Sequence, residues 1–367
     1  MKQVLIAKIE ETIETRKKRI EEIIDNNNID SEYKPLVKVI CKLIYEFLPN
    51  YSFKNLKRNI ADLKIEFAIF EPKDSREELG GYYSYENKIL LNEKLKNDPD
   101  KLTHVLTHEL IHVASARVYE KTLDKGISRV GFCETHNINE KKYFKIGYAL
   151  NEGVTELITR KILKDDFMGW SYEPQVLMAN MILSFTDEQK FYESFFAGDL
   201  EKLQSMISKI DNNQEKFENI IYNSDAFLVE SNKKPSEKQK NYLADMQKTC
   251  IKYFTTKLKQ DIKEKGLSFD EIKERVQKFN SYLITDGNRS KLNIRDDIAG
   301  KLDTVLPAFK EGINEILDTY KTFEKKNEVT LKKTKTMTGN GYIDALVISL
   351  VTLGMGLIGL KIIFLAM

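Results

Sequence analysis

The sequence has few cysteines, glycines and prolines, and almost no net charge. Its three cysteines form no CxxC pair, which excludes a disulfide-based fold and a thiolate zinc site and favours a reducing compartment. The 17 glycines and 7 prolines among 367 residues exclude a collagen-like or low-complexity chain and favour helices over turn-rich β structure. A formal charge of +2 provides no basic surface for nucleic acid, so we expect no nucleic-acid partner.

Long hydrophobic runs are also rare, and the main one covers residues 345–366. This run has 22 residues with Lys361 as its only charge, and a helix of that length measures about 33 Å, enough to cross a bilayer. The lysines just before it would stay on the cytoplasmic side. We therefore expect a single-pass C-terminal anchor in the cell membrane with the rest of the chain in the cytoplasm. The alternative is a buried core helix.

The patterns before this run predict helices with a small amount of sheet. Two segments rich in aromatic and β-branched residues, 63–70 and 82–91, predict strands, and 128–148 predicts a hairpin insertion. Helical periodicity covers most of the remainder, including residues 298–325, where Pro307 predicts a kink or break. The N-terminal segment has only four consecutive apolar residues before charges resume, which indicates no export signal.

The segment THELIH contains an HExxH motif inside a helical run. On a helix His108 and His112 lie four positions apart on one face, so both imidazoles can reach one metal ion. Glu109 would project beside the ion, where it can accept a proton from bound water. Since only four of the 367 residues are histidines, the motif is not expected by chance. This arrangement is typical of zinc hydrolases.

The third ligand is expected in the segment ALNEGVTELIT, where Glu152 follows the motif by 40 positions. Catalytic zinc sites use three protein ligands and a water, and a carboxylate can complete two histidines. The residues NEGVTE resemble the NExxSD element of thermolysin-like gluzincins, with Thr155 in place of serine and Glu156 in place of aspartate. By this resemblance, Glu156 and Asn151 would each accept the outer N–H of a ligand histidine.

The chain therefore resembles a gluzincin-clan zinc metallopeptidase over about residues 60–200, and it is similar to uncharacterised bacterial proteins with HELIH and LNEGxTE motifs. The resemblance implies a bound Zn²⁺ ion, a polypeptide substrate and Glu109 as general base. The predicted fold class is α+β and predominantly helical: a small zincin-like catalytic domain with a short sheet, a helical C-terminal region and a C-terminal transmembrane helix. The expected boundaries are 1–230 for the catalytic domain, 238–327 for the helical region, 328–344 for a basic linker and 345–366 for the transmembrane helix.

Peptide hydrolysis also needs a donor to the oxyanion, which gluzincins supply from Tyr, His or Arg. The candidates here are Tyr143, Tyr148 and His136, all in the predicted hairpin insertion or directly after it. His104 lies one turn before the motif and about 12 Å from its second histidine along the helix, so we expect it to be structural. The strand Tyr83–Leu91 could form an exposed edge that pairs with an extended polypeptide.

Two other functions stay open at this point. A non-enzymatic membrane-tethered interaction protein would use the long C-terminal helices and keep a structural or vestigial metal site. Intact Glu109 argues against this alternative, because a structural zinc needs no general base. A toxin or lysis factor would use residues 325–367 to perturb membranes.

Overall fold

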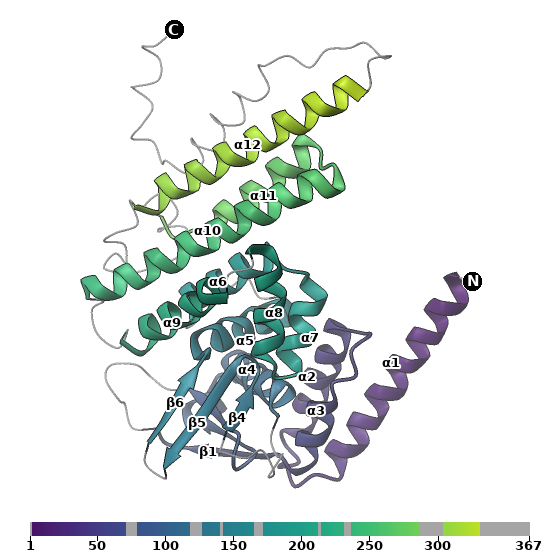
Figure 1. Ribbon diagram of the computed structural model, residues 1–367. Coiled ribbons are helices and arrows are strands. Elements are labelled where there is room, and N and C mark those ends of the chain that lie inside the picture. The colour runs from purple at the N-terminus through teal and green to yellow at the C-terminus, as the bar shows by residue number, and fades with distance from the viewer. Residues whose placement is uncertain are drawn as a thin grey trace. The chain divides into compact units, whose positions relative to one another are not determined.

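The computed structural model describes residues 2–70, 79–117, 127–139, 142–164, 172–211, 214–230, 236–285 and 304–330. The chain forms two compact units. The first comprises Met1–Phe167 with Asp187–Leu203, and the second comprises Met168–Thr186 with Gln204–Met367. Helices account for most of the described residues in each, and all described strands belong to the first unit (Figure 1).

The helices and strands of each unit have the following bounds. Within the first unit they are α1 (Lys2–Asp25), α2 (Lys34–Phe47), α3 (Lys54–Asn59), the 3₁₀ turn η1 (Ile60–Asp62), β1 (Lys64–Ala68), β2 (Gly80–Tyr83), β3 (Lys88–Asn92), the 3₁₀ turn η2 (Glu93–Asn97), α4 (Pro99–Ser115), β4 (Ile127–Val130), β5 (Cys133–Asn139), β6 (Lys142–Ile146), α5 (Tyr148–Leu163) and α7 (Glu188–Phe196). Within the second they are α6 (Glu173–Leu183), α9 (Gln214–Glu230), α10 (Glu237–Lys265), α11 (Phe269–Ser281) and α12 (Val305–Thr330), while α8 (Leu200–Asp211) has residues in both.

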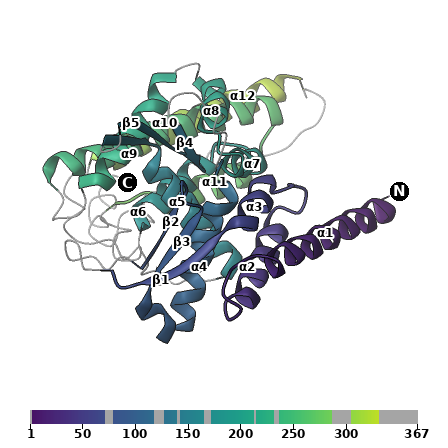
Figure 2. The same ribbon diagram turned by 90° about the horizontal axis from the view of Figure 1, so that it is seen from below.

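The first sheet differs from the prediction in one respect. Its strand order is β1-β3-β2, with β1 parallel and β2 antiparallel to β3. The segment 82–91, predicted as one strand, is wrong as such: β2 ends at Tyr83 and the chain turns back into β3. Asn87 makes this turn in the left-handed conformation at φ +48°, which asparagine tolerates better than most residues. The edges of the sheet are therefore β1 and β2, β2 lies against α4, and β3 is central (Figure 2). Of the predicted edge Tyr83–Leu91, only Tyr83 lies in an edge strand, because residues 88–91 belong to β3.

Helix α4, which contains the HExxH motif, is capped at both ends. At its N-terminus the Asp98 carboxylate accepts a hydrogen bond from the backbone N–H of Lys101 at 3.1 Å. Near its C-terminus the Asn59 amide donates to two of the last carbonyl groups, at 2.9 and 2.8 Å. Every residue from His104 to Ser115 is buried. The packing and the caps together fix the position of the motif.

The second sheet is the predicted hairpin insertion, with the antiparallel order β4-β5-β6. Gly131 joins β4 to β5 in the left-handed conformation at φ +54°. A Cβ atom at this position would lie 2.5 Å from the Phe195 ring and closer still to the side-chain oxygen of Asn151. Only glycine fits there, and its absence of a side chain lets the sheet approach α5 closely.

The prediction of a transmembrane helix is contradicted by the described helices. No helix among the described residues is both long and apolar enough to cross a membrane. The long helices α10 and α12, of 29 and 26 residues, carry charged side chains along their length. Each charged side chain would cost about 2.5 to 3.5 kcal/mol at the bilayer centre. The predicted span, 345–366, lies outside the described residues, as does most of the linker 328–344. The fold class is therefore mostly helical α+β with no transmembrane helix among the described residues, and the prediction of a cell-membrane location is wrong.

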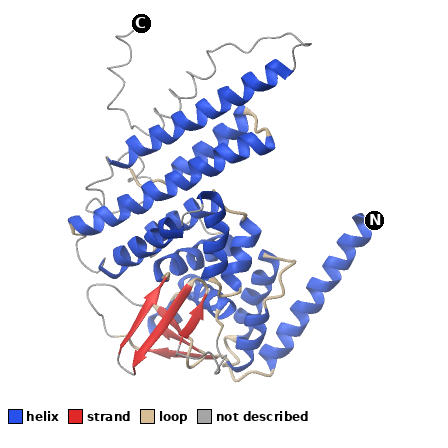
Figure 3. Cartoon of the chain, in the orientation of Figure 1, coloured by secondary structure: helices blue, strands red, loops and turns tan. Residues whose placement is uncertain are grey.

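The described part of the second unit consists of helices (Figure 3). Capping boxes start α10 at Ser236 and α11 at Ser268, and Gly266 ends α10 at φ +65°. The predicted break at Pro307 is instead a helix start, because α12 begins at Val305 and Pro307 lies in its first turn. A first-turn N–H has no partner within the helix, so proline costs little there.

Candidate metal centre

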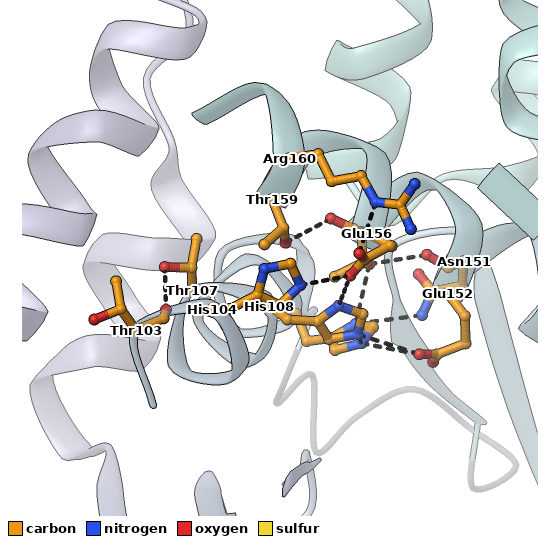
Figure 4. A network of polar contacts seen from close by, with 11 residues as sticks. Thr103, His104, Thr107, His108, Asn151, Glu152, Glu156, Thr159 and Arg160 are labelled. Atoms are coloured by element: carbon orange, nitrogen blue, oxygen red, sulfur yellow. Dashed lines mark hydrogen bonds and ion pairs between the residues drawn. The ribbon is translucent and has the colours of Figure 1, made fainter. Parts of the chain in front are cut away.

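Two helices of the first unit bring the site together. Each presents three polar side chains at intervals of four residues, namely His104, His108 and His112 on α4 and Glu152, Glu156 and Arg160 on α5. The two rows run in opposite directions. His112 meets Glu152, and His104 meets Glu156 (Figure 4). The three histidines and two glutamates are all buried.

His108, His112 and Glu152 form a buried cluster that could hold a metal ion. The Nε2 atoms of the two histidines are 3.2 Å apart. Oε2 of Glu152 lies 3.3 Å from Nε2 of His108 and 3.5 Å from Nε2 of His112. Three potential ligand atoms thus form a nearly equilateral triangle, and they are the three residues that the sequence predicted as ligands.

The outer nitrogen of His108 faces Glu156. Its Nδ1 atom lies 3.2 Å from Oε2 of Glu156, which is where the sequence predicted a carboxylate acceptor. Burial would lower the pKa of His108, but hydrogen bonds to Glu152 and Glu156 outweigh burial and raise the pKa to about 10. Burial also opposes ionisation of Glu156, yet hydrogen bonds from His104 and His108 hold its pKa well below the ordinary value.

The outer nitrogen of His112 has two polar neighbours. Its Nδ1 atom lies 3.3 Å from the amide nitrogen of Asn151 and 3.4 Å from the hydroxyl oxygen of Thr155. The amide oxygen of Asn151 accepts the backbone N–H of Phe132 at 3.2 Å, so the amide nitrogen faces the histidine. A ligand histidine bound through Nε2 carries its proton on Nδ1, and in this arrangement the Thr155 oxygen is the acceptor for it, in place of Asn151, which the sequence predicted.

Glu109, the predicted general base, is buried beside the cluster. The backbone N–H of Tyr82 hydrogen-bonds its carboxylate. Its Oε2 atom is buried and has no hydrogen-bond partner among the described residues. Burial raises the pKa of Glu109, although the neighbouring imidazoles of His108 and His112 act in the opposite direction. A buried carboxylate oxygen without a protein partner is available to a ligand or a water molecule.

The three predicted oxyanion donors lie in three different elements, α5, β6 and β5. Tyr148 opens α5, and the Lys145 ammonium lies 4.1 Å from the centroid of its ring. Tyr143 lies in β6, and its side chain is outside the described ones. His136, in β5, stacks on Phe144 at 4.7 Å. Their part in stabilising an oxyanion stays a prediction.

The sequence does not predict three of the contacts in this site. These are Thr155 with His112, His104 with Glu156, and Arg160 with Glu156. Arg160 donates from Nε to Oε1 of Glu156 at 2.9 Å. The sequence signal for it was the four-residue spacing from Glu156, which places both side chains on one face of α5.

No protein-family model, curated protein or solved structure matches the chain. The resemblance to gluzincins therefore depends on the two sequence motifs alone. What the geometry establishes is a buried His108, His112 and Glu152 cluster suited to a metal ion.

Proposed function

We propose that the protein is a zinc-dependent endopeptidase in which His108, His112 and Glu152 hold the ion. The observation that carries the proposal is the size of the ligand triangle, whose sides are 3.2, 3.3 and 3.5 Å. Tetrahedral zinc with bonds of about 2.0 to 2.2 Å separates its ligand atoms by about 3.4 Å. Two imidazoles and one carboxylate suit zinc and leave a fourth position for water.

The proposed chemistry is hydrolysis of a peptide bond. A zinc ion bound by these residues would lower the pKa of a water molecule and polarise the substrate carbonyl. Glu109 would accept the proton, because its Oε2 atom has no hydrogen-bond partner among the described residues and burial raises its pKa toward that of an effective general base. The same carboxyl group would return the proton to the leaving amine. Tyr143 and Tyr148 stay candidates for the oxyanion donor.

A polypeptide substrate is favoured by the position of β2. Its register with β3, in which the backbone N–H of Asn92 donates to the carbonyl of Leu79, directs the backbone groups of Gly80 and Tyr82 away from β3. One of these groups, the N–H of Tyr82, reaches Glu109. The N–H of Tyr82 is thus already bonded to Glu109, which places this edge next to the proposed general base, and an extended polypeptide running alongside β2 would pass directly beside it.

The test compares the full wild-type chain with Glu109→Gln and Glu152→Ala. Zinc content is measured by mass spectrometry of the metal, and hydrolysis is measured on a mixed peptide library. We expect about one zinc per wild-type chain, loss of zinc in Glu152→Ala, and retained zinc with about 10²- to 10⁴-fold slower cleavage in Glu109→Gln. Asp100→Asn removes an exposed charge from the same helix and serves as the matched control.

Each part of the proposal can fail separately. A wild-type chain without zinc, or unchanged zinc binding in Glu152→Ala, would overturn the ligand assignment. Unchanged cleavage in Glu109→Gln would overturn the role of the base. Stoichiometric zinc with no cleavage of any library peptide would instead favour a structural metal site in an interaction protein.

A further inference from the structure

The buried carboxylate of Glu156 receives hydrogen bonds from both helices. Its Oε2 atom lies 3.2 Å from Nε2 of His104 and 3.2 Å from Nδ1 of His108. Its Oε1 atom accepts from Nε of Arg160 at 2.9 Å. Only 2% of Glu156 is exposed, so these protein donors stand in for the water that would otherwise solvate the carboxylate. One oxygen is thus shared between the predicted ligand His108 and a histidine outside the ligand triangle.

His104 itself is too distant to join the ligand triangle. It precedes His108 by one helical turn, a rise of about 6 Å, and its contact is to Glu156 on the neighbouring helix. A glutamate side chain has three rotatable bonds, and one contact to His108 would leave its carboxylate able to turn. Donors from His104 on one helix and Arg160 on the other hold one oxygen each, which restricts rotation of the carboxylate that faces His108.

We propose that His104 is a positioning residue of the metal centre, which holds Glu156 in place so that Glu156 in turn orients the ligand ring of His108. The inference rests on the proposed metal site and extends it by one layer. Loss of the His104 donor leaves the Glu156 carboxylate held only by Arg160 and by His108 itself. The acceptor for the outer N–H of His108 is then held less firmly, and so is Nε2 of His108 in the ligand triangle. His104 then acts on metal affinity through Glu156 and touches neither metal nor substrate.

The experiment measures zinc affinity of the full chain by competition with a chromophoric chelator. Three variants separate the donor from the bulk of the side chain. His104→Gln can place an amide N–H where Nε2 lies, His104→Asn places its amide at the position of Nδ1, and His104→Leu has no donor. We expect a zinc dissociation constant near wild type for His104→Gln and about 10-fold higher for the other two, as is typical of residues that support ligands. The visible absorption of Co²⁺-substituted protein reports the ligand geometry independently.

A double-mutant cycle tests whether His104 acts through Glu156. In a Glu156→Ala background, His104→Leu should cause no further loss of zinc affinity. Equal affinities for wild type and His104→Leu, or a full additional loss in the Glu156→Ala background, would overturn the inference while leaving the zinc proposal intact. Absence of zinc binding by the wild type would overturn both. If His104→Leu does not fold, the comparison of His104→Asn with His104→Gln decides the same question.

Discussion

The contact between Gly131 and α5 gives a prediction whose magnitude follows from the structure. In Gly131→Ala the new methyl group would lie 2.5 Å from the Phe195 ring and would meet the side-chain oxygen of Asn151. The left-handed backbone, at φ +54°, costs an alanine about 1 to 2 kcal/mol. Overpacking of a buried contact adds about 1 to 3 kcal/mol. We expect a loss of about 2 to 5 kcal/mol in the free energy of unfolding of the first unit, measured by urea denaturation.

A second glycine separates these two contributions. Gly266 has a similar backbone angle, φ +65°, but a Cβ atom there would come only within 3.6 Å of Phe323, an ordinary contact. Gly266→Ala should therefore cost the second unit only the backbone part, about 1 to 2 kcal/mol. Gly131→Ala should also reduce zinc retention, since Asn151 contacts His112. Equal losses for the two variants, with unchanged zinc, would refute the reasoning.

Two further predictions concern other polar groups. Thr155→Val should raise the zinc dissociation constant about 10-fold while Thr155→Ser should not, because only serine keeps the acceptor for Nδ1 of His112. Equal zinc affinities of the two variants in the chelator competition would contradict this. Asp261→Asn should destabilise the second unit by about 1 to 3 kcal/mol at pH 7, since the buried Asp261 carboxylate pairs with Lys257 and Arg275 at 2.7 and 2.8 Å. Burial opposes ionisation of Asp261, but these partners lower its pKa below 3.8. The stabilisation by the ionised carboxylate is therefore present above pH 3.8 and is lost as the pH falls below it. If the difference in unfolding free energy between wild type and variant does not shrink between about pH 7 and pH 3, the assignment is contradicted.

The ligand triangle could be predicted because its information is local. His108 and His112 need only a helix to share a face, and Glu152 is embedded in a motif that can be read within six residues. What the sequence could not reveal was the alignment of α4 with α5. The contacts of His104 with Glu156 and of Thr155 with His112 depend on how two helices 32 residues apart pack, and no spacing within either helix encodes that.

The errors have similar physical reasons. The segment 82–91 has the β-branched and aromatic content of a strand, and its turn contains neither glycine nor proline, so only Asn87 marked the reversal. The length and hydrophobicity of 345–366 predicted a membrane span, but none of the described helices has the apolar length for one.

The pairing of His112 on α4 with Glu152 on α5 also means that a bound ion would cross-link the chain. The three cysteines are free and buried, so no described covalent bond links distant parts of the chain. A metal ion shared by His112 and Glu152 would close a loop of about 40 residues. A link across such a loop lowers the conformational entropy of the unfolded chain and so stabilises the folded state by about 4 kcal/mol. The ion would thus cross-link the first unit as a disulfide does elsewhere, and chelation would lower the melting temperature of the first unit while the second unit, which supplies none of these ligands, would keep its own.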